Sequence, residues 1–278
     1  MSWSDHWLPI TITVFAWWFS TGLILLLVRL PRRWHLQLLL GLAAAAGIAV
    51  WGLLASADNQ TPAGIYCGFF CVLLIWGWHE TSFLMGIIAG PRPKACPEGA
   101  KGWRRFGYAT ATVIYHEIAL FVTLIAIAAL TWQASNQIGL WVFAILFVMR
   151  LSAKFNIFLG VPNLTEEFFP AHLEHLKSYL PKRAMNWLMP ISLSASAGAA
   201  VWLWYSLGKN DLTDGNEISL VILMTLIGLG MLEHVFLITP LPDAALWRWA
   251  VPKRPHKIVG ILPPAVEPIT VLKKPENA

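Results

Sequence analysis

Seven apolar runs dominate the sequence, and each is long enough to cross a bilayer, for which an α-helix needs about 20 residues. They cover roughly residues 8–29, 36–55, 63–88, 108–131, 137–158, 186–206 and 218–239. No run shows the alternating pattern of a membrane β-barrel, and only helices and closed barrels satisfy their backbone hydrogen bonds in lipid. The sequence therefore predicts an all-α, polytopic integral membrane protein with about seven transmembrane helices.

Composition excludes a soluble globular protein. Of the 278 residues 57% are hydrophobic and only 13% are charged, and the mean hydropathy is +0.60. The formal charge of +5 would suggest an acidic partner for a soluble protein, but basic residues in a membrane protein mainly report the side on which each loop lies. We therefore expect membrane lipid around the helices and no nucleic-acid partner.

The basic residues alternate with the predicted spans. Nineteen of the 20 lysines and arginines border the first, third and fifth loops or lie in the C-terminal tail, and Lys209 alone lies on the other side. The positive-inside rule then places the N-terminus outside, in the periplasm, and the C-terminus inside, in the cytoplasm. We predict a single seven-helix transmembrane domain over residues 1–245, with an amphipathic cytoplasmic segment at 163–185, and a cytoplasmic tail over 246–278.

Three spans carry adjacent glutamate and histidine residues. The pairs are His79–Glu80, His116–Glu117 and Glu233–His234. At 1.5 Å per helical residue they lie roughly 8–12 Å from the cytoplasmic ends of their spans. Ionisable side chains in a membrane normally face the interior of a helix bundle and have partners there, so we expect the three pairs to converge.

The fifth loop adds further groups of the same kind beneath these pairs. It carries Glu166, Glu167, His172, Glu174 and His175. Pro170 suits the first turn of a helix that ends at Pro181. On such an α-helix His172, His175, Leu176 and Tyr179 would share one face, which could cover the mouth of the bundle.

Three interpretations of these residues remain open. Helix bundles build di-metal centres from inward-facing glutamate and histidine, so a di-iron or other divalent metal site is one of them. Its candidate ligands are His79, Glu80, His116, Glu117, Glu166, Glu167, His172, His175, Glu233 and His234. The second interpretation is an interhelical hydrogen-bond network. The third is a bacteriochlorophyll site in which His79 is the axial ligand and Trp76 and Trp78 pack on the macrocycle.

Several long blocks resemble the PuhE family, described as photosynthetic complex assembly factors of purple bacteria and other bacteriochlorophyll-containing phototrophs. The blocks are WWFSTG at 17–22, LPRR at 30–33, WGWHETSFLMG at 76–86, GPRPKACPEGAKGWRRF at 90–106, MRLSAKFNIFLGVPNLTEEFFPAHLEHLKSY at 149–179 and LEHVFLITPLPDAALWRWA at 232–250. The resemblance implies a multi-pass protein of the bacterial inner membrane, either cytoplasmic or intracytoplasmic photosynthetic. It brings no agreed catalytic residues.

Two classes of function compete. The resemblance implies an accessory factor for assembly of the photosynthetic reaction centre and core antenna, linked to bacteriochlorophyll supply, with subunits of those complexes or the pigment as partners. The glutamate and histidine residues instead suggest a membrane metalloenzyme, of oxidase or hydroxylase type, acting on a pigment, isoprenoid or lipid. We favour the assembly factor and keep the enzyme as the alternative.

Overall fold

The computed structural model describes residues 6–164, 170–208, 212–240 and 243–251, and all regular secondary structure in these ranges is helical. The long helices are α1 (Trp7–Val28), α2 (His35–Ala55), α3 (Pro62–Leu84), α4 (Gly102–Leu130), α5 (Ile138–Leu159), α6 (Leu188–Leu207) and α7 (Asp214–Ile238). Short 3₁₀ helices are η2 (Arg32–Trp34), η4 (Ala171–Tyr179) and η5 (Asp243–Trp247). Each long helix is apolar enough to cross a membrane, which confirms the predicted all-helical, multi-pass fold. The side on which each terminus lies stays a prediction.

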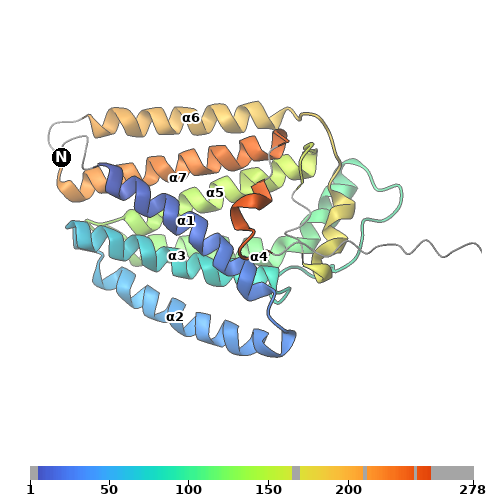
Figure 1. Cartoon of the computed structure of the whole chain (residues 1–278), viewed down its shortest axis with the longest axis horizontal. Helices are drawn as coiled ribbons and strands as arrows, with labels where there is room; N and C mark the ends of the chain where they lie inside the picture. The colour runs from blue at the N-terminus through green and yellow to red at the C-terminus, as the bar shows by residue number, and fades with distance from the viewer. Residues whose placement is uncertain (1–5, 165–169, 209–211, 241–242, 252–278) are drawn as a thin grey trace, which may run out of the picture.

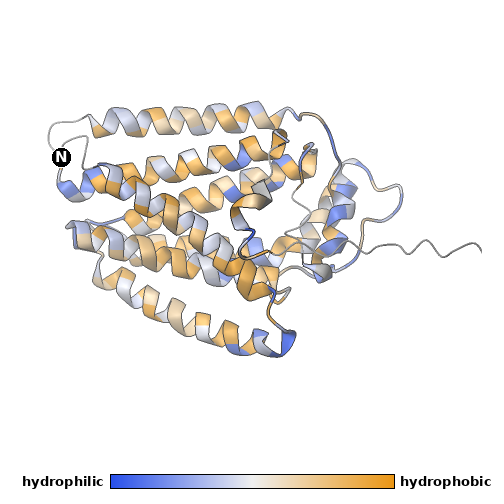
Figure 2. Cartoon of the chain, in the orientation of Figure 1, coloured by the Kyte–Doolittle hydropathy of each residue, from blue (hydrophilic) through white to orange (hydrophobic). Residues whose placement is uncertain are grey.

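The helices lie side by side as an up-and-down bundle (Figure 1). Helices α3, α5 and α7 contact one another and form the centre, while α2 packs on α3 and α6 packs mainly on α7. Fully buried apolar side chains fill the centre, among them Phe69 of α3, Phe143 of α5 and Ile222 of α7. Orange, apolar residues follow the helices along their length in Figure 2, as burial in lipid requires.

Local sequence signals explain several helix boundaries. Thr61 and Thr213 are the N-caps of α3 and α7, where their hydroxyl oxygens accept hydrogen bonds from backbone N–H groups. Helix α3 ends at Leu84, four residues earlier than predicted, because the chain turns at Gly86 with φ of 76°. Helix α4 begins six residues earlier than predicted, since its first turns are polar and extend beyond the apolar run.

The fifth loop contains the predicted short helix, but its geometry differs. Over Ala171–Tyr179 the chain forms a 3₁₀ helix, which has three residues per turn. Leu173, Leu176 and Tyr179 are therefore buried together on one face, and the predicted common face of His172, His175, Leu176 and Tyr179 is wrong. Residues 165–169 of this loop lie outside the described part of the chain.

The segment after α7 packs back on α1. Trp247, Ala250 and Val251 are buried in a cluster with Leu25. The indole N–H of Trp18 donates to the Leu246 carbonyl over 2.8 Å, and that of Trp247 donates to the Trp18 carbonyl over 2.9 Å. The described residues up to 251 thus belong to the helical body, whereas the division at 245/246 into domain and tail stays a prediction.

Candidate functional site

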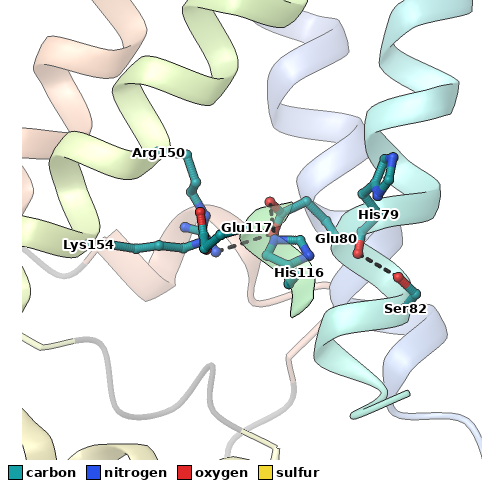
Figure 3. Close-up of polar contacts among 7 residues, drawn as sticks. All are labelled: His79, Glu80, Ser82, His116, Glu117, Arg150 and Lys154. Atoms are coloured by element: carbon teal, nitrogen blue, oxygen red, sulfur yellow. Dashed lines mark hydrogen bonds and ion pairs between the residues drawn. The ribbon is translucent and has the colours of Figure 1, made fainter. Parts of the chain in front are cut away.

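His79 and Glu80 lie in the last turns of α3 and are both buried. Successive residues on an α-helix point about 100° apart, so the two side chains separate, as Figure 3 shows. Nε2 of His79 is hydrogen bonded to the hydroxyl of Thr123 on α4 at 2.9 Å. Glu80 instead faces α5 and the neighbouring turn of α4, where it meets charged and ionisable groups.

Glu80 is shared between a cation and a histidine. Its Oε2 accepts a hydrogen bond from Nη2 of Arg150 on α5 at 3.3 Å, and its Oε1 lies 3.7 Å from Nε2 of His116 on α4. His116 is 0% exposed and stacks on the Phe83 ring with the centroids 4.5 Å apart. Two of the three predicted pairs therefore meet through Glu80 and His116 (Figure 3).

Glu117 forms a second ion pair beside the first. Its Oε1 accepts a hydrogen bond from Nζ of Lys154 at 2.5 Å, and the same ammonium lies 5.5 Å from the Phe83 ring centroid. Lys154 and Arg150 are four residues apart on α5 and so share a face. Phe83 thus stacks on His116 and also lies near the Lys154 ammonium.

Sequence reasoning missed the two cations of this site. Arg150 and Lys154 were assigned to the border of the fifth loop because they counted towards its positive charge. A signal was nevertheless present: both residues fall within the predicted span 137–158, at a spacing of four. Because an isolated charge in a membrane span is costly, two cations at that spacing indicate acidic partners on a neighbouring helix.

In the third pair, Glu233–His234, the two side chains also point to different partners. Glu233 on α7 accepts a hydrogen bond from the indole N–H of Trp17 on α1 at 2.8 Å, and it lies within electrostatic range of Arg150. His234 is buried and hydrogen bonds through Nε2 to the Ser152 hydroxyl at 2.9 Å and through Nδ1 to the Gly230 carbonyl at 2.8 Å. Glu233 therefore joins the charged groups, and His234 joins a neutral hydroxyl network.

The histidines of the fifth loop lie beneath the bundle. His172 packs against the end of α3, so closely to Gly86 that a side chain at Gly86 would collide with its ring. Burial lowers the pKa of His172 below its usual range, and the backbone of Leu84 acts in the opposite sense. Nδ1 of His175 is hydrogen bonded to the His172 carbonyl at 3.1 Å. Neither histidine has a described contact with Glu80, and the predicted ligands Glu166 and Glu167 lie outside the described residues.

Trp76, Trp78 and His79, the residues of the pigment hypothesis, are close in sequence but do not all contact one another. The Trp78 and His79 rings meet edge to face with centroids 5.0 Å apart, while Trp76 meets Phe143 edge to face at 5.3 Å. Nε2 of His79 has Thr123 as its partner, which leaves Nδ1 as the ring nitrogen without one. Binding of a bacteriochlorin here stays a prediction.

The positions of the charged side chains also bear on the metal hypothesis. Among the described residues, no group of three or more histidine, cysteine, aspartate or glutamate side chains is arranged to hold an ion. Glu80 and Glu117 already bind Arg150 and Lys154. A divalent ion that used both carboxylates would have to displace two cations, so the geometry fits a charge-compensated network better than a di-metal centre.

Comparisons with known proteins give two matches along nearly the whole chain. A family model described as "Protein of unknown function (DUF3623)" matches residues 3–258. An "uncharacterized 30.4 kDa protein in puhA 5′ region" of Rhodobacter capsulatus is 39% identical over 256 residues, which are 90% of this chain and 92% of that protein. No solved structure matches the chain significantly.

Proposed function

Because the chain belongs to the DUF3623 family, and a relative from Rhodobacter capsulatus is named for its place in the puhA 5′ region, we propose a role in photosynthetic-complex assembly. The protein is an accessory factor for the reaction centre and core antenna and is linked to bacteriochlorophyll supply. The relative's name, which places it in the puhA 5′ region, is the observation that carries this proposal. The resemblance to the PuhE family supports it.

The chemistry of the site is compatible with a factor that works by contact. Arg150 and Lys154 pair with Glu80 and Glu117, so these ion pairs join α5 to α3 and α4 and leave neither carboxylate as an unpaired buried charge. A network of this kind can hold helices in register while their outer faces meet partner subunits or pigment. The protein then resides in the bacterial inner membrane or its intracytoplasmic photosynthetic extension, with the N-terminus in the periplasm.

The test is a deletion strain complemented with charge-neutral variants. Glu80→Gln and Glu117→Gln keep the size and hydrogen-bonding capacity of each side chain but remove its negative charge. For an assembly factor we expect near-normal reaction-centre and antenna absorbance with both variants at normal protein abundance, and strongly reduced absorbance in the deletion strain. Glu98→Gln, at an exposed position in the third loop, is the matched control.

Two results would contradict the proposal. Unchanged absorbance in the deletion strain would remove the link to photosynthetic complexes altogether. Loss of absorbance with a stable, folded Glu80→Gln or Glu117→Gln protein, together with stoichiometric iron or manganese in the purified wild-type chain, would instead favour the metalloenzyme.

A further inference from the structure

Basic residues gather at the end of the bundle that carries the third and fifth loops. Residues 86–107 and 160–187 contain eight lysine and arginine residues but only four glutamates. Blue, hydrophilic residues collect around the start of α4 in Figure 2. Two of the arginines, Arg105 in the first turn of α4 and Arg183 between η4 and α6, lie within electrostatic range of each other.

Contacts with the end of α5 hold both of these arginines in place. Nη2 of Arg105 donates hydrogen bonds to the carbonyls of Phe158 at 2.6 Å and Tyr179 at 2.7 Å. The same guanidinium lies over the Phe158 ring, 4.3 Å from its centroid. The stem of Arg183 lies against Gly160, where a Cβ would come within 2.9 Å of the arginine Cδ. The two cations are therefore positioned before any ligand binds.

Neither arginine has a carboxylate partner within the described ranges. The two carbonyls that Arg105 binds are neutral and engage only its Nη2. Two neighbouring guanidinium groups without a carboxylate attract an anion, and their planar arrays of N–H donors match the oxygens of a phosphate group.

An apolar surface continues from these cations along α4 and α5. The Phe158 ring beneath Arg105 meets the Phe106 ring of α4 edge to face, with centroids 5.5 Å apart. Phe106 also stacks on Phe155 of α5 at 6.4 Å. Phe155 and Val148 are both exposed, and their spacing of seven residues puts them on one face of the helix. A ligand at the arginines thus has apolar surface directly beside it.

Two exposed tryptophans indicate the depth of the arginines in the membrane. Trp103 precedes Arg105 by two residues and is 85% exposed, and Trp187 follows Arg183 by four residues and is 67% exposed. Tryptophan is enriched where the hydrocarbon meets the lipid headgroups. Arg105 and Arg183 therefore lie at the level of the lipid phosphates.

We propose that Arg105 and Arg183 bind the phosphate of an anionic phospholipid, whose acyl chains lie along Phe106, Phe155 and Val148. A phospholipid uses both the cations and the apolar surface, whereas free phosphate uses only the cations. The lipid is anionic because a zwitterionic headgroup would bring a further positive charge to a basic surface. The proposal is independent of the role in photosynthetic-complex assembly.

The experiment counts lipids bound to the full-length protein. Protein freed of lipid in detergent is titrated with dioleoylphosphatidylglycerol, and native mass spectrometry resolves the species with none, one and more lipids bound. We expect the first lipid to bind wild type at lower lipid concentration than the following ones. Because a hydrogen bond to a charged group is lost, Arg183→Gln should weaken binding of the first lipid at least about tenfold.

Matched variants separate a specific site from general attraction to basic protein. Arg105→Gln should weaken the first lipid as Arg183→Gln does. Arg33→Gln is the control, because Arg33 is also an exposed arginine but precedes α2, which packs on α3. Circular dichroism checks that each variant is folded. If Arg105→Gln does not fold, Arg183→Gln decides alone, since the side chain of Arg183 is exposed.

The outcomes either support or overturn the proposal. Weaker binding in Arg183→Gln, with Arg33→Gln like wild type, supports it. Unchanged binding in Arg183→Gln overturns it, and so does equal weakening in Arg33→Gln, which would show that only the total charge matters. Equally tight binding of dioleoylphosphatidylcholine would overturn the requirement for an anionic lipid. Displacement of the first lipid by an equal concentration of inorganic phosphate would show that the apolar surface contributes nothing and would also overturn it.

Discussion

Lys154 combines three environments in one side chain. Its ammonium is paired with Glu117, lies near the face of Phe83, and is held at the end of an aliphatic stem within the bundle. The lysine side chain is 22% exposed and that of Glu117 is 16% exposed, so most of the pair lies against other side chains of the bundle. The contribution of this ion pair to the stability of the bundle therefore depends on both partners being present.

Removing one partner should cost more than removing both. Lys154→Met leaves the Glu117 carboxylate without a cation, and breaking a buried pair costs about 3–5 kcal/mol. We expect a clearly lower unfolding temperature in detergent for Lys154→Met, and recovery of most of the loss in Lys154→Met/Glu117→Gln. A double variant no more stable than Lys154→Met would contradict the assignment of this pair.

At the scale of single residues, the sequence predicted part of the candidate site. The three glutamate–histidine pairs stood out because ionisable residues are rare in membrane spans, and the structure places Glu80 and His116 in contact. The partners of the carboxylates were not predicted, since a count of loop charges does not separate Arg150 in a span from an arginine at its border. Nor could the sequence tell which member of each adjacent pair faces Arg150 or Lys154.

At the scale of the helices, one close approach lies at the start of α7. The first turn of α7 packs on the loop before α3 so closely that a Cβ at Gly215 would collide with the backbone carbonyl of Gln60. Gly228, on the same helix, has nothing within 4 Å of the position that a Cβ would occupy. The two glycines therefore provide a matched pair.

Gly215→Ala should destabilise the bundle, and Gly228→Ala should not. Backbone cannot move aside as a flexible side chain can, so overpacking at residue 215 should cost about 1–3 kcal/mol. Alanine at residue 228 should be neutral or slightly favourable, because alanine is the better helix former by about 1 kcal/mol. Thermal unfolding of both variants in the same detergent checks this, and equal unfolding temperatures would show that α7 does not approach the loop as described.

The elements also show where sequence patterns stop being informative. Apolar runs located all seven long helices, because the width of a bilayer imposes a length that the sequence must display. For η4 the sequence predicted the position of a short helix correctly, but not that it is a 3₁₀ helix and not an α-helix. An α-helical spacing of polar and apolar residues was assumed there, whereas contact with the end of α3 selects three residues per turn.

For the whole molecule the orientation in the membrane is the main untested prediction. In a chain that lacks its own cysteines, Glu98→Cys lies in the basic third loop and Asp58→Cys in the second loop at the opposite end of the bundle; both positions are exposed. The positive-inside rule predicts that an impermeant maleimide labels Asp58→Cys in intact spheroplasts and Glu98→Cys only after the membrane is opened. The reverse pattern would invert the topology.

The hydrogen bond from the Trp247 indole to the Trp18 carbonyl has a consequence for biosynthesis. These residues are 229 positions apart, and at translation rates of 5–20 residues per second the first waits on the order of 10–50 s for the second. Trp17 likewise waits for Glu233. Helix α1 also packs on α3, but its contacts with α7 and η5 form only after these last elements are made, so an insertase or chaperone has an interval in which this side of α1 is inserted but still unpacked.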